Sequence, residues 1–152
     1  SNELPIKITI AIPPLKNDKT EYLIQKLTEL GVSSIVLFNS ERNIAKIKKD
    51  KVESKLNRWQ KIIKEAAEQS KRNLIPDITY IDCFEKLIEY SKSLDSKKTP
   101  TQKNKNNTNL SAHNLIKSQT QKISNSKLKL LSLILQKHSG FNSVLAKISA
   151  RK

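Results

Sequence analysis

The 152-residue sequence has few of the residues from which many functional sites are built. It contains one cysteine, two glycines and no methionine, and 5% of its residues are aromatic. A single cysteine, Cys83, excludes an internal disulfide and is typical of a reducing cytoplasm. The scarcity of glycine argues against tight loops wrapped around a cofactor. Because His113 and His138 are far apart in the sequence, we expect no metal site.

Long apolar segments and catalytic signature motifs are also missing. No segment approaches the roughly 18–20 apolar residues of a membrane span, and the start SNELPIK lacks the apolar part of a signal peptide. GxGxxG, P-loop and HExxH motifs do not occur, so nucleophilic or metal-assisted catalysis has no positive support. We therefore expect a cytoplasmic protein with no membrane association, of a length that suits one domain.

Acidic residues are scarce in the second part of the chain. Residues 1–90 hold 16 Lys and Arg against 13 Asp and Glu, whereas residues 91–152 hold 13 against one, which is Asp95. The second part thus has a net charge of +12 out of the total of +15. Such a region favours a polyanionic partner, most simply RNA or DNA. A lysine-rich, solvated tail without a partner is the alternative.

What is present is an alternation of strand and helix patterns. Apolar residues recur at every second position in 6–15 and at helical spacing in 20–32. The expected elements are, in order, strand 6–15, helix 20–32, strand 33–39, helix 50–71, strand 77–84 and helix 85–94. This order predicts an α/β fold with a right-handed βαβ unit and a parallel sheet flanked by helices.

The composition changes after this part. Residues 95–127 are rich in Lys, Asn, Ser, Thr and Gln and show no apolar period, so we expect a disordered polar loop there. The apolar stretch LKLLSLIL at 128–135 predicts a further strand. The expected organisation is a folded part at 1–94, the loop at 95–127 and a final part at 128–152.

The polar side of helix 50–71 carries charges of both signs. Its members recur every three or four residues: Arg58, Lys61, Glu65, Glu68 and Arg72. Gln69 shares an edge with Glu65 and Arg72. Helix geometry alone favours a solvated, salt-bridged face, with a binding edge as the alternative.

Glu41 and Arg42 follow strand 33–39, at the edge of the predicted sheet where its parallel strands end. Ligands of open α/β sheets bind at this edge. Arg42 could hold a phosphate there through two parallel hydrogen bonds. Simple exposure to solvent is the alternative for a loop arginine.

The motifs IQKLTELGV, SER and RWQKIIKEAAEQSKR, in this order, resemble the RsmE-type ribosomal RNA methyltransferases of the trefoil-knotted SPOUT class. The resemblance covers about residues 6–82. It implies S-adenosylmethionine-dependent methylation of N3 of a uridine in 16S rRNA of the small ribosomal subunit, by a homodimer. It also implies an RNA-facing side that comprises Glu41, Arg42, Glu65, Gln69 and Arg72.

The same resemblance places the cofactor against LQKHSGFNS, which aligns with the family's I-G-P-E-G-G-F, and so implies Ser139, Gly140 and Phe141 as cofactor-binding residues. Lys137 and His138 stand where the family has small or different residues, and their side chains would crowd a contact that glycine permits. We also expect the family's PUA-like N-terminal domain and I-L-R-x-E-T-A segment to be absent, and the knot to be incomplete. A catalytically inactive, truncated remnant that binds RNA through its basic C-terminal region is therefore the alternative to an enzyme.

Overall fold

The computed structural model describes residues 3–16, 18–39, 45–96 and 145–150. Its elements are β1 (Ile6–Ile12), α1 (Lys19–Glu29), β2 (Ser34–Phe38), a 3-10 turn (Lys49–Lys51), α2 (Val52–Gln69), β3 (Asp77–Ile81), α3 (Phe84–Ser96) and β4 (Leu145–Ala150). The predicted alternation of strands and helices is therefore confirmed. The predicted strand at 128–135 lies outside the described residues, as does the polar loop apart from its first two residues, which extend α3.

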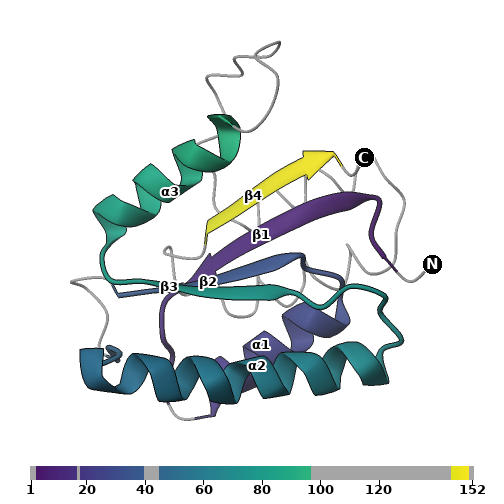
Figure 1. The fold of residues 1–152 in the computed structure, drawn as a ribbon, viewed down its shortest axis with the longest axis horizontal. Helices are drawn as coiled ribbons and strands as arrows, with labels where there is room; N and C mark the ends of the chain where they lie inside the picture. The colour runs from purple at the N-terminus through teal and green to yellow at the C-terminus, as the bar shows by residue number, and fades with distance from the viewer. Residues whose placement is uncertain (1–2, 17, 40–44, 97–144, 151–152) are drawn as a thin grey trace.

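The strands form one sheet in the order β3-β2-β1-β4 (Figure 1). β2 lies parallel to both β1 and β3, which confirms the parallel sheet that the sequence predicts. β4 runs antiparallel to β1, with Ile148 opposite Ile8. No strand is predicted from the sequence at 145–150, so this antiparallel strand is an addition to the predicted fold.

Helices cover both faces of the sheet, α1 and α2 on one face and α3 on the opposite face (Figure 1). Side chains alternate between these faces along each strand. The larger cluster packs strand residues against α1 and α2; these residues include Ile8, Ile10, Ile12, Ile35 and Leu37. The smaller cluster packs Ala11, Val36 and Phe38 against Leu87 of α3. Burial on both faces explains why β2 is apolar at nearly every position.

The buried side of α2 follows the predicted helical spacing in its second half. Trp59, Ile63, Ala66 and Ala67 are buried. Val52 and Leu56 are only partly buried against the same cluster. Among the described helices, none combines the length and the apolar composition needed to cross a membrane.

Candidate functional site

The last two turns of α2 carry the polar edge that the sequence analysis singled out. Glu65 and Gln69 are both exposed and lie four residues apart, on one side of the helix. Within the described part of the chain, neither side chain forms a hydrogen bond or an ion pair. The two groups can therefore bind a ligand without first breaking a contact inside these residues.

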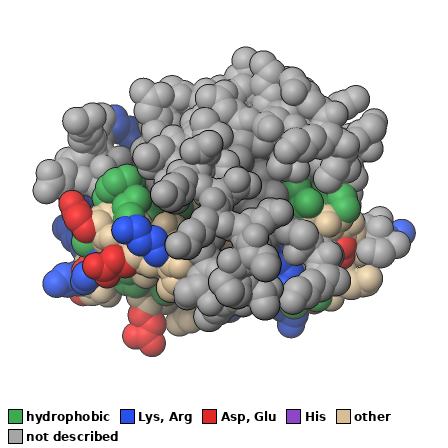
Figure 2. Space-filling view, turned by 90° about the horizontal axis from the view of Figure 1, so that it is seen from above, with side chains coloured by type: hydrophobic (Ala, Val, Ile, Leu, Met, Phe, Trp, Pro, Cys, Tyr) green, Lys and Arg blue, Asp and Glu red, His purple; other side chains and the backbone are tan. Residues whose placement is uncertain are grey.

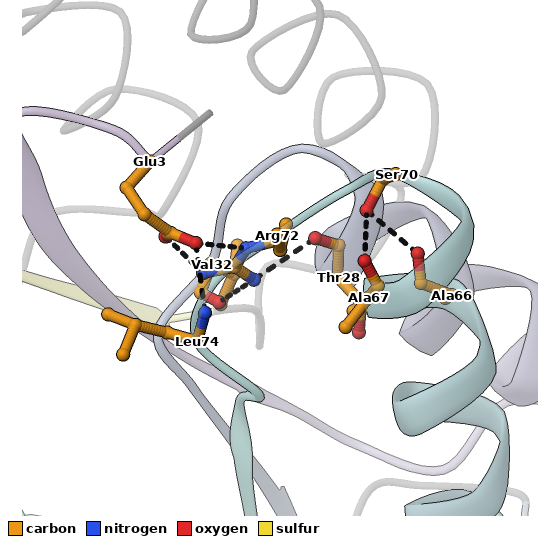
Figure 3. Close-up of polar contacts among 8 residues, drawn as sticks. All are labelled: Glu3, Thr28, Val32, Ala66, Ala67, Ser70, Arg72 and Leu74. Carbon is orange, nitrogen blue, oxygen red and sulfur yellow. Dashed lines mark hydrogen bonds and ion pairs between the residues drawn. The ribbon is translucent and has the colours of Figure 1, made fainter. Parts of the chain in front are cut away.

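Arg72 does not belong to this edge. Its side chain has 0% exposed surface, and Nη1 donates hydrogen bonds to the backbone oxygens of Thr28 at 3.1 Å and Val32 at 2.8 Å (Figure 3). The expectation that Arg72 is exposed beside Glu65 is wrong. The physical reason is that α2 ends at Gln69 and Lys71 adopts a φ of 57°, which turns the chain away from the helix face.

Arg58, expected on the same strip, pairs with a residue of another helix. Its Nη2 donates a hydrogen bond to Glu21 Oε2 of α1 at 3.1 Å. This hydrogen bond to Glu21 raises the pKa of the Arg58 guanidinium. On the side of the molecule opposite α1 and α2, acidic and basic side chains also lie next to each other on the described surface (Figure 2). Charge pairing between helices therefore accounts for part of the mixed polar face.

Asn39 lies at the end of β2, at the carboxyl edge of the sheet. Its amide donates to Ile47 O at 2.9 Å and to Tyr80 Oη at 2.8 Å, and its Oδ1 accepts from Ile47 N at 3.0 Å. Burial raises the pKa of the Tyr80 hydroxyl, which favours its protonated form. Asn39 thus fixes the two ends of the segment that carries Glu41 and Arg42, a role that sequence patterns did not reveal because it depends on Tyr80 of β3.

Glu41 and Arg42 themselves lie outside the described residues, and so do Ser139, Gly140 and Phe141. Their assignment to RNA and to a cofactor therefore stays a prediction.

A second polar pair lies just beyond β3. Lys86 Nζ contacts Asp82 Oδ1 at 3.1 Å, and the hydrogen bond between the two side chains lowers the pKa of Asp82 and raises that of Lys86. Lys86 is exposed on the first turns of α3 and Asp82 is partly buried just before that helix, and their spacing of four residues is that of a weakly stabilising pair. Nowhere in the described residues do three His, Cys, Asp or Glu side chains gather as metal ligands would.

A groove of about 580 Å³ runs beside β3. Its lining includes Ser34 and Asp77, the first residues of β2 and β3, together with Gln60 and Lys64 of α2. It therefore lies near the amino ends of the parallel strands, opposite to the edge where ligands of such sheets bind. The geometry assigns no ligand to this groove.

A family described as RNA methyltransferase domain matches residues 2–129. The chain belongs to this family. Ribosomal RNA small subunit methyltransferase E of Bacillus subtilis is 42% identical over 95 residues, covering 62% of this chain and 37% of that protein. The protein of the same name from Mesomycoplasma hyopneumoniae is 37% identical over 110 residues, covering 72% of this chain and 48% of that protein.

A crystal structure of a hypothetical protein is similar as well, with a TM-score of 0.55 and 39% identity over 60% of this chain and 37% of that one. The resemblance to RsmE-type proteins and the predicted α/β fold are thereby confirmed. The chain spans less than half of the length of the curated relatives it matches. The segment in which a knot was expected lies outside the described residues.

Proposed function

We propose that this chain acts on small-subunit ribosomal RNA as an RsmE-like methyltransferase domain, in which the end of α2 faces the RNA. The observation that carries the proposal is the exposed edge of Glu65 and Gln69, whose polar groups have no partner among the described residues. This edge belongs to the segment RWQKIIKEAAEQSKR, one of the motifs that carry the resemblance to RsmE-type proteins, and it lies within residues 2–129, which the family matches. Carboxylate and amide groups of this kind can read the edges of an unpaired base.

The proposed reaction is methylation of N3 of a uridine in 16S rRNA. S-adenosylmethionine supplies the methyl group when bound, and the family resemblance assigns Ser139, Gly140 and Phe141 to its binding. In the proposal Arg42 binds an RNA phosphate, and Glu65 with Gln69 orients the base. Glu41 lies beside Arg42 in the sequence and belongs to the same proposed surface.

Two binding measurements test the two parts of this proposal separately. The first is isothermal titration of the chain with S-adenosylmethionine. Saturable binding in the micromolar range supports the enzyme. No binding at millimolar cofactor contradicts it for this chain, because the residues aligned with the family's glycine-rich segment then do not hold the donor.

The second measurement is the affinity for a transcript of Bacillus subtilis small-subunit rRNA, since the relative in that organism is 42% identical. Glu65→Gln removes a negative charge, so general electrostatics alone would strengthen binding to RNA. If Glu65 recognises the base, Glu65→Gln weakens binding instead. Glu53→Gln, the same charge change on the exposed first turn of α2, is the matched control. Equal changes in RNA affinity for Glu65→Gln and Glu53→Gln would contradict the proposed site.

The second candidate function is RNA binding without catalysis, through the basic region. It is supported by the net charge of +12 over residues 91–152. This function predicts tight, strongly salt-dependent RNA binding with no preference for small-subunit rRNA and no effect of Glu65→Gln beyond that of Glu53→Gln. Absent cofactor binding together with this pattern would favour the second candidate over the first.

A further inference from the structure

A buried polar cluster lies where the start of the chain meets the end of α2. Glu3 accepts hydrogen bonds from Arg72 Nε at 3.2 Å and Nη2 at 2.7 Å, one on each carboxylate oxygen, and a third from Leu74 N at 3.3 Å (Figure 3). The Glu3 side chain is 8% exposed and that of Arg72 is 0% exposed. Because Thr28 and Val32 accept from Nη1, five residues form what we call the Arg72 cluster: Glu3, Thr28, Val32, Arg72 and Leu74.

The cluster joins three separate parts of the chain. Thr28 and Val32 lie at the end of α1 and in the turn before β2, Leu74 lies in the turn before β3, and Glu3 lies ahead of β1. Only a planar guanidinium can serve a carboxylate with two parallel hydrogen bonds and two carbonyl groups at the same time. A lysine at position 72 would keep the charge but could not reproduce this geometry.

From this geometry we infer that Arg72 is a positioning residue, which fixes the last turn of α2 and with it Glu65 and Gln69, and that it does not contact RNA itself. The inference rests on the proposed function of the α2 edge. All three nitrogen atoms of the guanidinium already donate within the protein. An RNA phosphate could reach the group only if the cluster opened, which would separate a buried carboxylate from the guanidinium that pairs with it.

The turn between α2 and Arg72 makes the coupling direct. Arg72 N donates to Ala67 O at 2.9 Å, and Ser70 Oγ donates to Ala66 O at 2.7 Å (Figure 3). These two hydrogen bonds tie the backbone of Arg72, the residue that carries the guanidinium, and the side chain of Ser70 to the last turn of α2. A shift of Arg72 would move Gln69, which lies three residues before it, and thus the edge that the proposed function assigns to the base.

RNA affinity measured across a range of salt concentrations tests the inference, with Arg72→Lys, Glu3→Gln and wild type compared at a temperature where circular dichroism shows all three folded. A positioning role predicts that both variants lose affinity by about fivefold or more, with the salt dependence unchanged, because a base contact is misaligned and no phosphate contact is removed. A direct phosphate contact predicts that Glu3→Gln does not lose affinity and that Arg72→Lys retains most of it.

Coupling to Gln69 separates positioning from general loss of stability. If Arg72 acts through the α2 edge, Arg72→Lys costs less affinity in a Gln69→Ala background than in wild type. Equal losses in the two backgrounds would overturn the inference. Glu53→Gln, at the opposite end of α2, is the control that should not couple to Arg72.

Hydrogen exchange distinguishes failure of the inference from failure of the proposed function. The amide of Leu74, which donates to Glu3, should exchange faster in Arg72→Lys and Glu3→Gln and at the wild-type rate in Glu53→Gln. Unchanged exchange would overturn the cluster itself. If wild type does not bind small-subunit rRNA but the amide of Leu74 exchanges faster in the two variants, the proposed function and the role of Arg72 toward RNA are contradicted. The cluster itself is then supported.

Discussion

The C-terminal ends of α1 and α2 have the same backbone geometry but different residues at the key position. After α1, Gly31 N donates to Thr28 O and Val32 N to Leu27 O; after α2, Lys71 N donates to Glu68 O and Arg72 N to Ala67 O. Both are Schellman motifs, in which one residue takes a positive φ. That residue is Gly31 at 99° in the first and Lys71 at 57° in the second.

The difference between the two ends follows from what each one touches. A Cβ on Gly31 would lie 2.7 Å from Leu4 Cγ, so that site excludes a side chain by contact as well as by backbone angle. Lys71 is exposed, and its φ lies in the left-handed region, which residues other than glycine adopt at a cost of about 1–2 kcal/mol. A glycine is thus required where the turn is covered, and is dispensable where the turn faces solvent.

The largest predicted effect comes from Arg72→Ala, which breaks the link between the two helix ends. The substitution removes the guanidinium from the nearly buried Glu3 carboxylate and the donor from Thr28 O and Val32 O. We expect the free energy of unfolding to fall by about 3–5 kcal/mol. Urea denaturation followed by circular dichroism measures it, and a loss as small as that of a surface substitution would contradict the buried pair.

Gly31→Ala should have the next largest effect. The methyl group meets Leu4 and the backbone angle is unfavourable, so we expect a loss of about 1–3 kcal/mol in unfolding free energy. A companion variant, Leu4→Ala combined with Gly31→Ala, separates the two causes by denaturation. If contact contributes, the penalty of Gly31→Ala is smaller when Leu4 is already Ala.

Lys71→Gly tests the C-terminal end of α2, where we expect the substitution to stabilise the fold. Glycine removes the cost of the left-handed backbone but increases the entropy of the unfolded chain, so we expect a net stabilisation of about 0.5–1 kcal/mol. The measurement is the shift of the urea midpoint at constant slope. Destabilisation by Lys71→Gly would show that the lysine side chain contributes more than its backbone angle costs.

The smallest effect is expected where the same two helices are joined away from their C-terminal ends. Arg58→Ala removes the ion pair with Glu21. The side chain of Arg58 is 69% exposed and that of Glu21 is 26% exposed. Solvent and salt screen such a pair. We therefore expect an unfolding midpoint equal to that of wild type in high salt and only slightly lower in low salt. A loss comparable to that of Arg72→Ala would remove the distinction between exposed and buried pairs.

Much of the fold could be predicted from local patterns. Alternation of isoleucines in β1 and helical spacing in α1 and α2 identified these elements and the faces they bury. The predicted helices 20–32 and 50–71 both run past the observed ends, because α1 ends at Glu29 and α2 at Gln69, each just before a residue with positive φ. The β4 strand escaped prediction because its pairing with β1 joins distant parts of the chain.

The candidate site was predicted in part. Glu65 and Gln69 lie on an exposed helix edge, as their spacing predicted. Spacing extended through a helix could not reveal that Arg72 follows a turn and is buried. Nor could it reveal Asn39, because the partners of its side chain, Ile47 and Tyr80, are brought to it by the loop and by β3.

By itself the sequence determined the α/β alternation, the amphipathic faces of the helices and membership of the RNA methyltransferase domain family, because these depend on the spacing of residues and on shared motifs. Only the tertiary structure decided which charged side chains face solvent. Arg58 and Arg72 look alike in the sequence, yet one lies exposed beside Glu21 and the other is buried against Glu3. The free energy of a charge depends on the partners and the water around it, and distant segments supply those partners.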